Sequence, residues 1–147
     1  MNPSGLAELR TMYVFTPNDG ETWALTFDGF KAYLLARDPA AFLQVDEGGT
    51  GPVRTTSLQF GVTFGDEELE GFALLSPEGV AVKNCTAQEA ASFVVWLRDQ
   101  VVPQNKAVTF NTEWGIEEDA PDEPVPGLTR PRLVAAFLAH LEALGLD

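Results

Sequence analysis

The sequence has one cysteine, one histidine and no long hydrophobic run. Cys85 cannot form a disulfide within the chain, which fits a reducing compartment or a protein indifferent to redox state. No stretch approaches the ~20 consecutive apolar residues that a membrane span requires. The segment from Met1 to Arg10 lacks the basic cluster and apolar block of a secretory signal. We therefore expect a cytoplasmic protein without membrane contact.

Basic residues are also scarce, with nine Lys and Arg against 22 Asp and Glu and a formal net charge of -13. Such a charge repels phosphates and anionic lipid headgroups over roughly 8 Å, the Debye length at physiological salt. We therefore expect no binding of nucleic acid. The charge has a simpler explanation as well, because a net negative surface keeps a small protein in solution.

The 147 residues, 45% of them apolar, are enough for a single globular domain over residues 1–147. A chain of this length buries about two-thirds of the surface that its unfolded form exposes, so it needs no metal or disulfide to fold. No repeat is visible. The composition changes only at Asp119–Gly127, where Asp, Glu and Pro predict a loop.

Three segments have helical signals. Thr26 can cap a helix that ends at about Arg37, before Asp38 and Pro39. Thr86 and Glu89 have the spacing of a capping box, in which each side chain bonds the other residue's backbone N–H. That helix is expected to end near Val102, before Pro103. The third helix has Pro131 in its first turn and Gly145 after its end.

Other segments have the alternation of strands. It is clearest over 58–64, where Leu58, Phe60, Val62 and Phe64 share one face. With 70–75 and 80–82 this segment predicts a three-stranded antiparallel meander. Residues 12–15 and 107–112 are expected as further strands, the latter beside the meander. The sequence thus predicts an α+β fold, with a largely antiparallel sheet of about four to six strands and two or three helices packed mainly on one face.

Nucleophilic catalysis has little support. His140 is the only imidazole, and it borders the apolar stripe of the last helix, so we expect a half-buried or surface histidine with a structural role. Cys85 precedes a helix N-terminus, which can favour a thiolate. A small buried side chain is the simpler interpretation. No nucleophile-elbow motif is present.

Metal and nucleotide binding are not expected either. Six carboxylates lie within Glu113–Glu123, but they lack the spacing and the glycine of a calcium loop. One His and one Cys are too few for a zinc site. The Gly48–Pro52 segment has no lysine and is followed by a strand, so we interpret it as a loop that holds no phosphate. No cofactor is predicted.

The acidic residues and two tryptophans suggest a protein-binding surface. Ten of the 22 acids lie in two short segments, 66–70 and 113–123, and no Lys or Arg lies within either. Trp96 falls on the polar side of its predicted helix, and Trp114 lies near the start of the second segment, next to Glu113. Aromatic anchors with a charged rim are typical of protein interfaces. Alternatively, the acidic loop or the last helix covers both tryptophans. The predicted partner-binding residues are Glu113, Trp114, Glu117, Glu118, Asp119, Asp122, Glu123, Asp66, Glu67, Glu68 and Trp96.

These features favour a non-enzymatic acidic protein-binding module with a basic protein as its partner. In size, acidity and layout the chain is similar in kind to bacterial immunity proteins, which inhibit cationic toxin domains. That likeness implies an inhibitor of a basic bacterial partner. The alternative is a small-molecule-binding protein or an enzyme with a pocket between the sheet and its helices, in which Glu113 or Asp28 is a general base tuned by burial.

Overall fold

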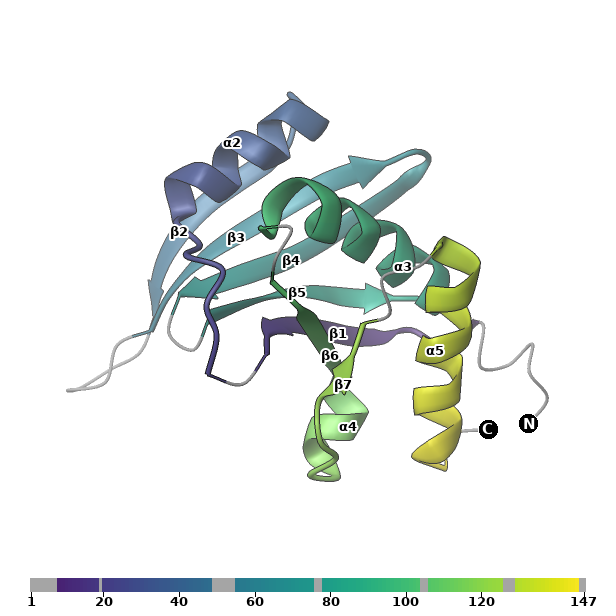
Figure 1. Cartoon of the computed structure of the whole chain (residues 1–147). Helices are drawn as coiled ribbons and strands as arrows, with labels where there is room; N and C mark the ends of the chain where they lie inside the picture. The colour runs from purple at the N-terminus through teal and green to yellow at the C-terminus, as the bar shows by residue number, and fades with distance from the viewer. Residues whose placement is uncertain are drawn as a thin grey trace.

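The computed structural model describes residues 8–18, 20–48, 55–75, 78–103, 106–125 and 129–145. These residues form one antiparallel sheet of seven strands in the order β2-β3-β4-β5-β1-β6-β7, with helices packed against it (Figure 1). The predicted α+β class and antiparallel sheet are confirmed, and the sheet has one strand more than the upper expected number.

Strands and helices are interleaved along the chain. The strands are β1 (Thr11–Pro17), β2 (Phe42–Gly48), β3 (Thr55–Phe64), β4 (Glu67–Leu75), β5 (Glu78–Cys85), β6 (Val108–Thr112) and β7 (Glu123–Pro124). The helices are α2 (Phe27–Arg37), α3 (Ala87–Trp96), the π-helical turn η1 (Leu97–Val101), α4 (Glu113–Glu117) and α5 (Arg130–Ala143).

The predicted meander is confirmed as β3, β4 and β5, which pair in sequence. The strand over 107–112 was expected beside this meander, and that placement is wrong. The N-terminal strand β1 lies between β5 and β6, so that Val14 pairs with Ala81 on one side and Asn111 on the other. The short strand β7 extends the same edge by pairing with β6.

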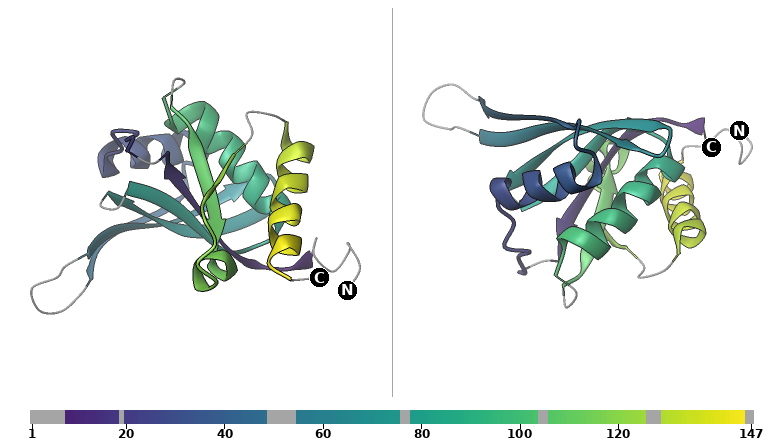
Figure 2. Two further views of the ribbon diagram at one scale, coloured as in Figure 1. Left: turned by 60° about the horizontal axis from the view of Figure 1, so that its bottom comes forward. Right: turned by 90° about the horizontal axis from the view of Figure 1, so that it is seen from above.

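The helices α2, α3 and α5 cover one face of the sheet (Figure 2). The core lies between these two layers and contains many aromatic rings. Phe93 of α3 is central: its ring stacks on Phe60 at 5.8 Å between centroids and packs against Phe15, Phe64 and Trp96. The alternating side chains of β3 are buried on this face, as the sequence pattern predicts.

The helix boundaries follow the predicted signals. The Thr26 hydroxyl accepts a hydrogen bond from the Gly29 backbone N–H, and Thr86 with Glu89 forms the complete capping box. Gly145 follows α5 with a φ of 83°, a conformation that glycine adopts without strain. The expected turn or loop around Gly48–Pro52 and the segment before Glu8 lie outside the described residues, except for Gly48 at the end of β2.

Three elements lack a sequence prediction: β2, α4 and β7. The strand β2 has no clean alternation because it is an edge strand whose two faces are both partly exposed, with Phe42 and Val45 on its surface. The residues of α4 come just before the loop predicted over Asp119–Gly127, and those of β7 lie within it. Among the described helices, none is long and apolar enough to span a membrane.

Candidate functional site

The structure divides the predicted partner-binding residues between two distant places. One group lies on α4 and the chain that follows it to β7, at the bottom of the molecule in Figure 1. The second group lies at the turn between β3 and β4, at the upper right of the same view, where Trp96 of α3 also lies nearby. A single flat partner contact therefore cannot use both groups at once, and we describe them separately.

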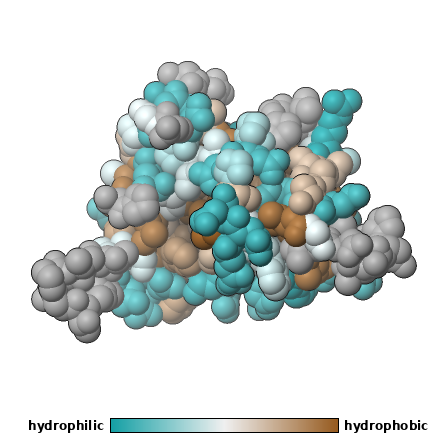
Figure 3. Space-filling model, turned by 90° about the horizontal axis from the view of Figure 1, so that it is seen from below, coloured by the Kyte–Doolittle hydropathy of each residue, from teal (hydrophilic) through white to brown (hydrophobic). Residues whose placement is uncertain are grey.

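The first group forms a surface that we call the α4 face. It carries two exposed apolar side chains two positions apart in α4, Trp114 at 40% and Ile116 at 50% exposure. Exposed carboxylates surround them on α4 and the following turn. Seen from below, the side of the molecule that carries α4 has hydrophilic surface at its centre with hydrophobic patches beside it (Figure 3). The α4 face comprises Glu113, Trp114, Ile116, Glu117, Glu118, Asp119 and Asp122.

The carboxylates of the α4 face form no ion pair with any residue that the structure describes. In the part of the chain that the structure describes, ion pairs join Arg10 to Glu89 and Arg98 to Asp99, a hydrogen bond joins His140 to Glu123, and none of these involves the α4 face. Their negative charge is therefore not neutralised within the described molecule. The surface therefore combines exposed apolar side chains with a surplus of negative charge.

Asn111, the penultimate residue of β6, anchors the α4 face to the sheet through hydrogen bonds of its side chain. Its side-chain amide donates to the Ala120 backbone carbonyl and to Asp122, both at 3.0 Å, and its carbonyl oxygen accepts from the Thr112 backbone N–H at 2.8 Å. Asn111 is buried; its bond from the Thr112 N–H is buried as well, and its bonds to Ala120 and Asp122 are partly buried. One side chain thus fixes both the start and the end of the acidic segment.

Thr112 and His140 add further hydrogen bonds that hold the start of α4. The Thr112 hydroxyl caps α4 by accepting from the Gly115 backbone N–H at 3.1 Å, and it also bonds His140 Nε2 at 3.0 Å. The other ring nitrogen, Nδ1, bonds the Glu123 carboxylate. With Nδ1 donating to Glu123, Nε2 is free to accept the Thr112 hydroxyl proton. His140 therefore links α5, β7 and the start of α4.

This carboxylate, imidazole and hydroxyl series has the order of a catalytic triad, but its burial excludes that role. Thr112 is completely buried and His140 is 3% exposed, so a substrate cannot reach the hydroxyl. The histidine is more deeply buried than the sequence suggests, and both of its ring nitrogens are bonded. Glu123, one of the predicted partner-binding residues, serves this internal contact.

Gly115 shows how closely α4 packs on its support. A Cβ atom at this position would lie 2.0 Å from Asn111 Oδ1 and 3.1 Å from His140 Cε1. Only glycine allows the helix to approach the buried amide and the imidazole so closely. The exposed residues on either side of Gly115 are consequently held on a rigid base.

The second group borders a groove between the β3–β4 turn and α3. Asp66, Glu67 and Trp96 line it, while Glu68 is exposed outside it. Trp96 was expected to be exposed on the polar side of its helix, but it is half-buried. The helical position of Trp96 faces α2 and β3, where its ring packs against Phe30 and Phe64. A helical wheel places the side chains of one helix only, so it could not reveal that Trp96 contacts α2 and β3.

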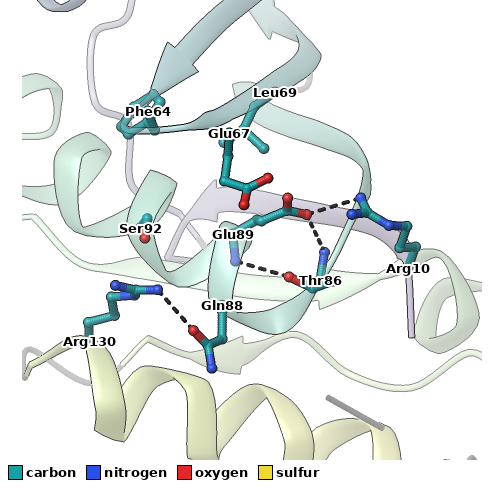
Figure 4. Close-up of a pocket in the computed structure, with 9 residues that line it drawn as sticks. All are labelled: Arg10, Phe64, Glu67, Leu69, Thr86, Gln88, Glu89, Ser92 and Arg130. Carbon is teal, nitrogen blue, oxygen red and sulfur yellow. Dashed lines mark hydrogen bonds and ion pairs between the residues drawn. The ribbon is translucent and has the colours of Figure 1, made fainter. Parts of the chain in front are cut away.

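Next to the groove, Glu89 of the capping box accepts from the Thr86 backbone N–H at 2.9 Å and from Arg10 at 3.1 Å. Its carboxyl group faces that of Glu67 (Figure 4). The hydrogen bond with Glu89 and then its negative charge raise the pKa of Glu67. Burial works to raise the pKa of Glu89, but its hydrogen bonds to Thr86 and Glu67 and the charge of Arg10 outweigh burial and lower it.

Several contributors to these two places were not predicted from the sequence. Ile116, Asn111 and Arg130 carried no motif, and Glu89 was interpreted only as a helix cap. The candidate general bases Asp28 and Glu113 are both exposed, and neither lines the groove. Among the described residues, no three His, Cys, Asp or Glu side chains gather closely enough to hold a metal ion.

Cys85 is completely buried at the end of β5. Burial, and to a lesser extent the charge of Glu89, raises the pKa of its thiol to about 12. The thiol is therefore protonated at neutral pH and acts as a small apolar side chain.

Comparison of the chain with protein-family models and with curated proteins finds no match to either.

Proposed function

We propose that the protein is a non-enzymatic binding module that uses the α4 face to contact a basic protein partner. The observation that carries this proposal is the exposure of Trp114 and Ile116 among carboxylates that have no cation partner in the described chain. Burying the two apolar side chains favours association, and the carboxylates favour a partner with Lys and Arg around an apolar contact.

The rigid support of the α4 face also favours binding. Asn111, Thr112 and His140 fix the segment by buried and partly buried hydrogen bonds, so little conformational entropy is lost when a partner docks. The carboxylates increase the association rate, because a field of several kT attracts a cationic protein before contact. An inhibitor that must reach its target quickly would use both properties. The immunity-type inhibitor of a basic bacterial toxin domain is the specific form that we propose.

The first test compares three immobilised baits in a lysate of the source cells: the wild type, a triple variant of the α4 face and a matched control. The α4 variant carries Glu117→Lys, Glu118→Lys and Asp119→Lys. The control carries Glu21→Lys, Asp28→Lys and Asp46→Lys, three exposed acids outside the α4 face, so that both variants change the net charge equally.

We expect the wild type and the control to retain the same basic polypeptide and the α4 variant to lose it. Mass spectrometry identifies the polypeptide, and a second capture with the purified polypeptide shows whether the contact is direct. Retention of the same proteins by all three baits contradicts the proposal, as does a captured partner with a net negative charge.

A further inference from the structure

A small cavity of about 260 Å³ lies between the start of β4 and the first two turns of α3 (Figure 4). It is smaller than the roughly 300–1,000 Å³ of sites for drug-sized ligands, so it suits a small metabolite. Both signs of charge line it: Glu67 and Glu89 contribute carboxylates, and Arg10 and Arg130 contribute guanidinium groups.

The two carboxylates provide a place for a cation. Glu89 Oε1 already accepts from Thr86 and Arg10, and the Glu89 carboxyl group also shares a hydrogen bond with Glu67. Glu67 faces Glu89 and has no Lys or Arg at ion-pair distance in the described chain. Two facing carboxylates repel each other, so a positively charged group between them is stabilised. The hydrogen bond with Glu89 and then the negative charge of Glu89 raise the pKa of Glu67.

Arg130 provides a place for an anion. Its Nη2 atom donates to the neutral Gln88 side chain at 3.0 Å, and no carboxylate among the described residues pairs with it. The guanidinium therefore keeps free donors, and a planar carboxylate fits such a group with two parallel bonds. Arg10 differs, because it is already bonded to Glu89 and to the Asn84 carbonyl.

The cavity opens into the larger groove of about 670 Å³ described above. The two share Phe64, Glu67, Ser92 and Arg130, and the groove continues along Val95 and Trp96. An apolar group attached to a ligand in the cavity can therefore lie along an aromatic wall of Phe64 and Trp96, beside Arg37, which lies 4.6 Å from the Phe64 ring centroid. That wall favours aromatic and large aliphatic groups over a hydrogen atom.

We propose that this cavity binds a free α-amino acid with a large apolar side chain. The ammonium group lies between Glu67 and Glu89, the carboxylate contacts Arg130, and the side chain extends along Phe64 and Trp96. This inference goes beyond the proposed function, because it concerns a different ligand at a different place. It does not depend on the α4 face.

The test uses isothermal titration of the full chain with L-phenylalanine, L-leucine, L-methionine, L-tryptophan and glycine. Two analogues of L-phenylalanine each remove one charge: phenethylamine lacks the carboxylate and 3-phenylpropanoate lacks the ammonium group. Glu67→Gln and Arg130→Gln remove the protein groups. Glu68→Gln and Arg132→Gln are matched controls, since both residues are exposed and neither lines the cavity.

We expect saturable binding of at least one large apolar amino acid, with glycine and both analogues weaker by ~10-fold or more. Glu67→Gln and Arg130→Gln should each weaken binding by ~10-fold or more, and the controls by less than about twofold. The proposal is overturned if no amino acid binds at concentrations up to about 10 mM. It is also overturned if phenethylamine binds as tightly as L-phenylalanine, or if the cavity variants bind like the controls.

Discussion

Removal of the His140 imidazole tests whether the buried network holds the α4 face. In His140→Ala the Thr112 hydroxyl and the Glu123 carboxylate each lose a partner, and a cavity opens beside Phe110, whose ring centroid lies 5.1 Å from that of His140. The perturbation is local, because His140 contacts the end of β6 and the start of α4 but lies outside the main aromatic cluster around Phe93.

The cost can be worked from three contributions. Loss of a buried ring costs about 2 kcal/mol at the low end for large-to-small substitutions, which is appropriate because the half-exposed Glu123 admits water. The neutral bond to Thr112 contributes ~1 kcal/mol and the bond to the carboxylate ~1.5 kcal/mol. The expected loss is therefore about 4 to 5 kcal/mol, a large part of the roughly 5–15 kcal/mol stability of a typical domain.

Urea unfolding measures this loss as a lower midpoint, compared with Glu142→Ala as an exposed control on the same helix. The control should change stability by less than about 0.5 kcal/mol. A double-mutant cycle with Thr112→Val should give a coupling of about 1 kcal/mol or more between the two side chains. A loss below about 1 kcal/mol for His140→Ala, or no coupling, would refute the role assigned to the network.

Three further predictions concern the sheet and its core. Phe60→Ala should cost about 3 to 5 kcal/mol, because the ring is buried between Phe30 and Phe93; a loss under about 1 kcal/mol would mean that the faces of β3 are reversed. Gly71→Ala should destabilise the protein strongly, because the new Cβ would lie 2.0 Å from the Ala81 carbonyl oxygen. Gly61→Ala should change stability little, because the nearest atom to its Cβ lies at 3.6 Å. Equal melting temperatures for the two variants would contradict this packing. Cys85 should resist iodoacetamide at pH 8 in the native protein and react in urea, because its thiol is buried and has a pKa of about 12. Mass spectrometry measures the labelling, and rapid labelling of the native protein would contradict the burial of this thiol.

Local signals in the sequence were sufficient wherever one segment determines its own structure. The hydroxyls of Thr26 and Thr86 cap helices at the predicted places, and the alternation over 58–64 predicts which side chains of β3 are buried. Such features depend on backbone hydrogen bonds and on residue spacing within a few positions. They need no knowledge of the rest of the fold.

Features that depend on distant segments were not predictable in this way. The insertion of β1 between β5 and β6 leaves no trace in any of the three strands, since it pairs residues about 65 to 100 positions apart. Trp96 is half-buried because α2 and β3 cover it. The same holds for the candidate sites, where Asn111, His140 and Arg130 act through contacts with other segments.

The most direct measurement is the association rate of the captured basic partner with the wild type, the α4 variant and the control variant at several salt concentrations. The proposed function predicts that Glu117→Lys, Glu118→Lys and Asp119→Lys together slow association by roughly one to two orders of magnitude at low salt, with the difference shrinking as salt screens the charges. The control, with its three changes elsewhere, should slow association far less. Equal rates for the two variants would mean that the carboxylates around Trp114 act only through net charge, and the α4 face would not be the binding site.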